Sequence, residues 1–210
     1  MSVAIKIRQV KKMFREMRKV RVSDYEYFLS KKYKFGNPDN SFIIRHYDDD
    51  VVRQEMLWAY PNDKEALAGR GFGVTADGHF KYELLLPTPA TKDDMEDFMK
   101  FACELAKYMR ATEIEIDGKF VAIKDIESKK EIVNQMQELN KNQLENLIGN
   151  YERAGVFTGS FHPVYLPRDE YNKIKNAKSE DVMAIFAGLL DKFQIREYKE
   201  FIHLKREKYR

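Results

Sequence analysis

The chain has 210 residues, of which 43% are hydrophobic, 13% aromatic and 34% charged. Such a chain can bury a substantial core and keep its charges in solvent, which excludes an intrinsically disordered protein. No segment approaches the ~18 apolar residues of a membrane span, and the N-terminal apolar run is too short for a signal peptide. The only cysteine, Cys103, cannot form an internal disulfide. We therefore expect a cytoplasmic protein.

The net charge of +3 hides an uneven distribution along the chain. Residues 1–21 hold eight basic side chains against one acidic side chain, and residues 192–210 hold seven against three. The intervening stretch is therefore acidic, with a net charge of −8. Two interpretations stay open: the basic ends dock on the acidic body, or they bind nucleic acid or another polyanion.

Alternating apolar residues predict a strand over residues 3–7. Residues 9–20 are read either as a basic amphipathic helix or as part of a hairpin whose second strand covers 17–22. A helix is then expected from an N-cap at Ser23 to about Lys32.

The middle of the chain predicts strands separated by turns. The expected strands cover residues 42–44, 51–60, 72–75 and 79–86, and the expected turns lie at 37–40 and 48–50. Asp77-Gly78 favours a hairpin between the last two strands, since both residues tolerate positive φ.

The second half of the chain contains three clear helical patterns. Thr91 is the expected N-cap of a helix to about Arg110, a second helix covers about 127–148 with Gly149 as its C-terminal cap, and a third follows Ser179. Short strands are expected at 112–116, 120–123, 156–157 and 164–166, with Asp117-Gly118 joining the first two.

Strands and helices do not alternate regularly, and the dipeptide turns favour antiparallel pairing. The sequence therefore predicts an α+β fold with a mainly antiparallel sheet and several amphipathic helices packed on it. We expect one domain over residues 1–210, with a division into two lobes near 123–128 as the alternative.

Two groups of side chains are candidates for catalysis or metal binding. His46 and Asp48 would share a face of a strand, and a histidine with carboxylates can bind a divalent metal and activate water. Glu113 and Glu115 would share a face of another strand and could act as acid and base. The alternatives are a ligand-free acidic turn and an ordinary half-buried strand.

Three further residues are candidates for partner binding. Trp58 and Tyr60 would lie on one face of a strand, either in the core or as an exposed aromatic strip. Arg70 lies in the glycine-rich segment Gly69-Arg70-Gly71, which precedes a strand rather than a helix and lacks the Gly-Lys-Ser/Thr of a phosphate loop.

The segments 80–89, 91–94, 155–159 and 165–167 carry a family resemblance. Their sequences are FKYELLLPTP, TKDD, GVFTG and YLP. They resemble a family of uncharacterised bacterial proteins of about this length, over most of the chain. The resemblance implies a bacterial, cytoplasmic setting and no particular activity.

The first functional hypothesis is a non-enzymatic cytosolic binding protein that acts through a protein surface, with the chain itself as one partner in a homodimer. It needs no cofactor. The alternatives are a metal-dependent hydrolase that uses the His/Asp/Glu residues, and a nucleic-acid or polyanion binder that uses the basic termini.

Overall fold

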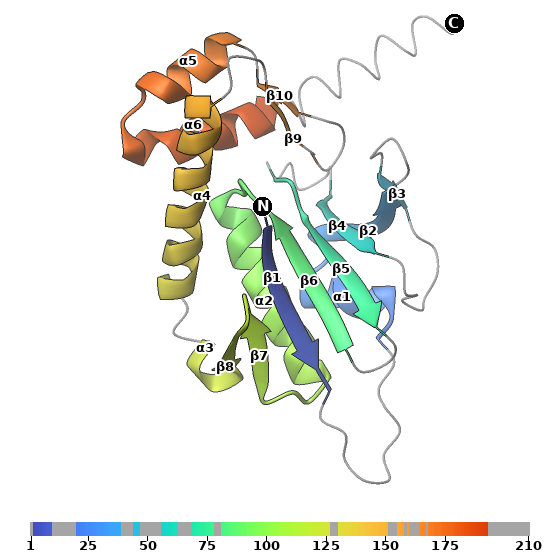
Figure 1. The fold of residues 1–210 in the computed structure, drawn as a ribbon. Helices are drawn as coiled ribbons and strands as arrows, with labels where there is room; N and C mark the ends of the chain where they lie inside the picture. Colours follow the sequence, from blue (N-terminus) through green and yellow to red (C-terminus); the bar gives the residue numbers. More distant parts are fainter. Residues whose placement is uncertain are drawn as a thin grey trace, which may run out of the picture.

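A computed structural model describes the fold of most of the chain (Figure 1). The described residues are 2–9, 20–38, 44–46, 56–62, 69–77, 81–126, 130–150, 155–157, 159, 164–166 and 168–192. The strands among them are β1 (Ser2–Arg8), β2 (Tyr33–Pro38), β3 (Ile44–His46), β4 (Leu57–Pro61), β5 (Phe72–Asp77), β6 (Lys81–Pro87), β7 (Glu113–Ile116), β8 (Lys119–Ala122), β9 (Gly155–Phe157) and β10 (Val164–Leu166). The helices are α1 (Val22–Phe28), α2 (Lys92–Tyr108), α3 (Ile123–Ile126), α4 (Lys130–Asn150), α5 (Arg168–Asn176) and α6 (Ser179–Asp191).

The described strands form an eight-stranded sheet in the order β3-β2-β4-β5-β6-β1-β7-β8 and a small hairpin of β9 and β10. Every pair of neighbouring strands is antiparallel. The expectation of an α+β fold with a mainly antiparallel sheet is therefore confirmed.

Helices α1 and α2 cover one face of this sheet, and both lie behind it in the view of Figure 1. Alternate residues of the strands point into the layer between sheet and helices, because the side-chain period of a strand is two. On β1 these residues are Val3, Ile5 and Ile7, all buried. Aromatic rings from α1, α2 and the strands β2, β5 and β6 fill the layer, with Phe101 of α2 in contact with Tyr25, Phe28, Phe35 and Phe72.

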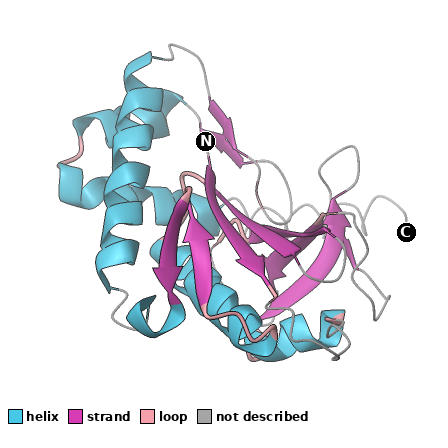
Figure 2. Cartoon of the chain, turned by 60° about the horizontal axis from the view of Figure 1, so that its bottom comes forward, coloured by secondary structure: helices cyan, strands magenta, loops and turns pink. Residues whose placement is uncertain are grey.

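A second, smaller hydrophobic cluster lies in the C-terminal part of the chain. It consists of the buried residues Leu144, Val164, Leu166, Ile174, Val182, Phe186, Leu189 and Leu190. Helix α4 links the two clusters, since Val133 and Met136 pack into the first and Leu144 into the second. Figure 2 shows α4 running beside the sheet layer toward α5 and α6. The two clusters thus meet along α4.

The first helix differs from its expected bounds. Helix α1 begins at Val22, with Arg21 as N-cap, so Ser23 lies inside the first turn and is not the cap. The backbone N–H of Arg21 donates to the Asp24 carboxylate at 2.9 Å, which starts the helix early and turns Val22 and Tyr25 toward the core. The helix ends at Phe28 and not at Lys32, because Ser30 and Lys31 have positive φ. Residues 10–19, for which helix and hairpin compete, lie outside the described residues.

Strand β2 was not expected, because Gly36, Asn37 and Pro38 are typical of turns. In the structure Gly36 pairs with Trp58 of β4 on one side and with His46 of β3 on the other, so these residues continue the sheet and do not form a turn. The expected hairpin of β5 and β6 is present, but Asp77 pairs with Lys81 and so belongs to the strand and not to the centre of the turn.

Helix α2 has the expected N-cap, and the turn between β7 and β8 is the expected Asp117-Gly118 turn. Gly149 does not end α4, which continues to Asn150. Helix α5 was missed, although Asp169 and Glu170 in its first turn and basic residues in its last turn are typical of a helix. None of the helices in the described part of the chain is long and apolar enough to span a membrane.

Candidate functional site

The sheet face opposite α1 and α2, called here the outer face, carries polar and charged side chains on β1, β6 and β7. Because directly opposite residues of antiparallel strands share a face, the register places Glu83, Lys6, Glu115 and Phe120 in one row across β6, β1, β7 and β8. The row alternates acidic and basic groups and ends on an aromatic ring. Phe120 is 62% exposed, so the row ends on an apolar side chain that faces solvent.

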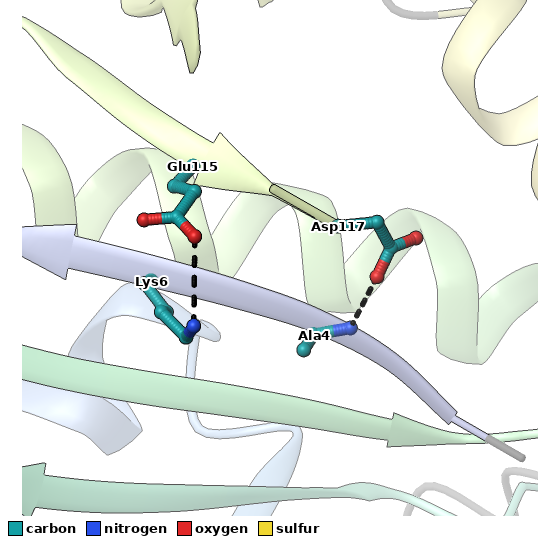
Figure 3. A network of polar contacts seen from close by, with 4 residues as sticks. All are labelled: Ala4, Lys6, Glu115 and Asp117. Carbon is teal, nitrogen blue, oxygen red and sulfur yellow. Dashed lines mark hydrogen bonds and ion pairs between the residues drawn. The ribbon is translucent and has the colours of Figure 1, made fainter. Parts of the chain in front are cut away.

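Side-chain contacts join β1 to β7 on this face (Figure 3). The Lys6 ammonium lies 3.5 Å from the Glu115 carboxylate. At the end of β7, the Asp117 carboxylate accepts from the backbone N–H of Ala4 at 3.1 Å, and the Asp117 N–H donates to the Ala4 carbonyl at 3.1 Å. These contacts fix the start of the Asp117-Gly118 turn against β1.

A small cavity of about 120 Å³ opens where β1 and β7 separate, and we call it the β7 groove. The paired positions of the two strands are Ile5 with Ile116 and Lys6 with Glu115. The groove is lined by Lys6, Arg8, Gln9, Thr112, Glu113, Glu115 and Phe120. Among the described residues, the buried side-chain oxygen of Gln9 has no hydrogen-bond partner.

The lining sets two cations against two carboxylates, with an amide, a hydroxyl and an aromatic ring between them. Its formal charge is balanced, so it suits a partner that brings both signs of charge and not a simple anion or cation. The volume is below the roughly 300 Å³ typical of small-molecule pockets. The groove can therefore receive a side chain or a chain end from a protein better than a whole cofactor.

Strand β8 forms one edge of the sheet. Ile116 pairs with Lys119 across a two-residue turn in which Asp117 and Gly118 both have positive φ. In such a hairpin the pair next to the turn exchanges backbone hydrogen bonds, and the next pair does not. The N–H and C=O of Phe120 therefore point away from β7, toward the side of β8 on which no described strand lies.

A second polar cluster lies in the interior, around Asp94 in the first turn of α2. The Asp94 carboxylate is fully buried and accepts from the backbone N–H groups of Arg70 at 2.9 Å and Gly71 at 3.1 Å and from the Thr91 hydroxyl at 2.9 Å. Burial raises the pKa of Asp94 above its usual range, and these hydrogen bonds oppose the rise. The glycine-rich segment thus does surround an anion at a helix N-terminus, but the anion is the protein's own carboxylate.

Arg70 is only 4% exposed, and its guanidinium donates to the Pro89 carbonyl at 2.7 Å. Its guanidinium carbon also lies 5.8 Å from the centre of the Phe157 ring in β9. Burial lowers the pKa of Arg70 to about 10, which leaves it charged at neutral pH. Arg70 therefore ties the C-terminal hairpin to the loop before α2, and its charge does not face solvent.

Asn140 of α4 makes a similar connection. Its amide accepts from the Ala90 N–H and donates to the Ala90 carbonyl, both at 2.6 Å. It is fully buried, and it also lies 3.3 Å from the Met183 sulfur of α6. Arg70 thus joins the loop 87–91 to β9, and Asn140 joins the same loop to α4 and α6.

Trp58 is 9% exposed and lies between Gly36 and Gly73 of the neighbouring strands. Its indole N–H donates to the Arg70 carbonyl at 3.0 Å. The structure therefore favours the core interpretation of Trp58 over an exposed aromatic strip. Tyr60 is half-buried and pairs with Lys34.

His46 and the two glutamates lie far apart. His46 is on β3, at the opposite edge of the sheet from β8, and five strands separate β3 from β7. Six strand spacings of ~4.8 Å make the separation on the order of 29 Å, while metal–ligand bonds are ~2–2.5 Å. His46 therefore does not share a metal with Glu113 or Glu115. The pairing of His46 with Asp48 remains a prediction, since Asp48 lies outside the described residues.

Glu113 and Glu115, in contrast, line the same groove. Among the described residues, no group of three or more His, Cys, Asp or Glu side chains is placed to hold a metal ion. Of the basic N-terminal residues, Lys6 and Arg8 lie on β1, next to the groove. Residues 193–210, which carry most of the basic C-terminal charge, are outside the described residues.

Sequence reasoning missed Lys6 and Phe120. Lys6 is 109 residues from its partner Glu115, so no spacing could pair them. Phe120 gave a usable signal: it follows an Asp-Gly turn in a short strand, where its alternation with Val121 places one of the two outside the core.

An eight-stranded antiparallel sheet, helices on one face and a charged outer face together define an α+β protein. A family model described as a domain of unknown function (DUF4299) matches residues 2–199, and the chain belongs to this family. No curated protein and no solved structure is significantly similar to the chain.

Proposed function

We propose that the protein is a non-enzymatic binding protein of the bacterial cytoplasm, and that a protein partner contacts the β7 groove and the adjoining edge of β8. The observation that carries the proposal is the exposure of Phe120 beside a row of alternating charges. Large exposed aromatic side chains are enriched where proteins bind one another, and surrounding charges select the partner.

The groove contributes the polar part of this surface. Lys6 and Glu115 are already paired at 3.5 Å, whereas Arg8 and Glu113 are exposed at the open end. A partner that places one charge of each sign there gains two ion pairs without removing the existing one.

The β1 and β7 backbones hold this surface in place. Strand β1 pairs over its whole length with β6, and its other edge pairs with β7. Rigid strands limit the conformational entropy that is lost on binding, which favours the use of such a surface for recognition.

A photoreactive benzoylphenylalanine at position 120 tests the proposal in cells that express the full chain. Irradiation is expected to give covalent adducts with protein. Tyr27 provides the matched control, because it is 76% exposed on α1, on the other side of the sheet. Adducts that are absent at position 120, or equally abundant at position 27, would contradict the proposal.

A further inference from the structure

We propose that the partner at β8 is a second copy of this chain, which pairs antiparallel with β8 so that the two sheets continue across a two-fold axis at Phe120. The inference rests on the proposed function and names the partner of the same surface. Strand β8 is an edge strand, and an edge strand presents backbone donors and acceptors that match another strand.

The direction of the Phe120 backbone supports this pairing. Its N–H and C=O point away from β7, because the hydrogen-bonded pair next to the turn is Ile116 with Lys119. When Phe120 of one copy lies opposite Phe120 of the other, each N–H meets the other C=O. The two rings then lie side by side on the outer face, where each is 62% exposed in the single chain.

The same register brings Ala122 of each copy opposite Gly118 of the other. Gly118 has a φ of +83°, and a Cβ built on it would meet nothing within 4 Å. The turn therefore leaves open space beside the edge, and the glycine has no side chain to obstruct the second strand.

The bounds of β8 favour this register over the one with its axis at Val121. An axis at Phe120 pairs Gly118 with Ala122 and Lys119 with Val121, so the paired residues belong to β8 and its turn and no like charges are directly opposite. An axis at Val121 would instead place Lys119 opposite Ile123 and Gly118 opposite Lys124, and both of these residues belong to helix α3, which cannot pair as a strand. An axis perpendicular to the sheet also keeps both outer faces on one side, so the two β7 grooves flank the pair of phenylalanines.

Sedimentation velocity of the purified full chain over a range of concentrations tests the inference. The unmodified chain is expected to form a dimer. Phe120→Thr keeps the backbone N–H and removes the ring, and should weaken the dimer at least about tenfold, as the loss of ~1.4 kcal/mol implies. Phe120→Pro removes the outward N–H while leaving the hydrogen bonds of Ile116 and Lys119 in place, and should give a monomer.

Circular dichroism checks that Phe120→Pro keeps its fold. If it does not fold, Phe120→Asp takes its place, since it sets two carboxylates opposite each other at the axis and should also give a monomer. A chain that is monomeric at every concentration, or a dimer that Phe120→Asp leaves unchanged, would overturn the inference. If the chain is monomeric and its position-120 adducts contain a different protein, the pairing with a second copy is overturned and the proposed function is retained. If no adducts form at all, the proposed function is overturned as well.

Discussion

The Asp94 carboxylate accepts a hydrogen bond from the backbone N–H of Arg70 at 2.9 Å, across 24 residues of sequence. The same carboxylate holds Gly71 and completes the capping box of α2 with Thr91. One buried carboxylate thus fixes both the start of α2 and the entry to β5.

Replacement of Asp94 should therefore be strongly destabilising. Asp94→Ala leaves the N–H groups of Arg70 and Gly71 buried without an acceptor, which should lower the free energy of unfolding by about 3 kcal/mol or more. Urea denaturation measures the effect. Asp93→Asn is the control, because Asp93 is exposed in the same turn and should change stability by less than about 0.5 kcal/mol. Equal effects of the two substitutions would show that the buried carboxylate is not structural.

Two glycines with positive φ should respond differently to alanine. Gly71 has a φ of +70°, and a Cβ there would collide with the Ala59 carbonyl oxygen of β4. Gly71→Ala should therefore lower the free energy of unfolding by at least about 2 kcal/mol, from strain and collision together. Gly118→Ala, at a φ of +83° in open space, should show the strain alone, about 1 kcal/mol. Thermal unfolding of both variants would contradict the geometry if Gly118→Ala were the more damaging.

Two buried tyrosines should also differ. Among the described residues the buried Tyr25 hydroxyl has no hydrogen-bond partner, so Tyr25→Phe should leave stability within about 0.5 kcal/mol or increase it. The Tyr33 hydroxyl donates to the Asp97 carboxylate at 3.0 Å, so Tyr33→Phe should lower the free energy of unfolding by about 1 kcal/mol. Denaturant titrations of both variants check this, and a larger loss for Tyr25→Phe would indicate a partner for its hydroxyl.

Asp97 should make stability depend on pH in the acidic range. Burial raises the pKa of Asp97 above its ordinary value of 3.8, despite the hydrogen bond from Tyr33. The folded chain therefore binds this proton more tightly than the unfolded chain does. The resulting stabilisation is fully present below pH 3.8 and is lost as the pH rises through the folded pKa. The stability of the unmodified chain relative to Asp97→Asn should thus fall with rising pH across this window, and a rise would show that the pKa is lowered.

Local signals in the sequence predicted the elements that depend on neighbouring residues. The capping box of Thr91 and Asp94 and the Asp117-Gly118 turn are of this kind, because their hydrogen bonds or φ angles are set within four residues. Strand β2 was missed, since its Gly36 and Pro38 are explained only by the strands on either side.

The candidate site was less accessible to sequence reasoning for the same reason. Glu113 and Glu115 were recognised from their alternation in a strand. Their opposing cation, Lys6, comes from β1, and only the sheet order brings the two strands together. His46 was grouped with the glutamates by residue type alone, and the sheet order separates them.

Amide hydrogen exchange at Phe120, measured on the full chain at low and at high protein concentration, tests the binding surface most directly. The Phe120 N–H points to the free edge of β8, so its exchange should slow as concentration rises and the second strand forms. Val121 pairs with Ile114 inside the sheet, and its N–H should exchange at the same rate at both concentrations. A Phe120 amide whose exchange is independent of concentration would contradict pairing of two copies through β8.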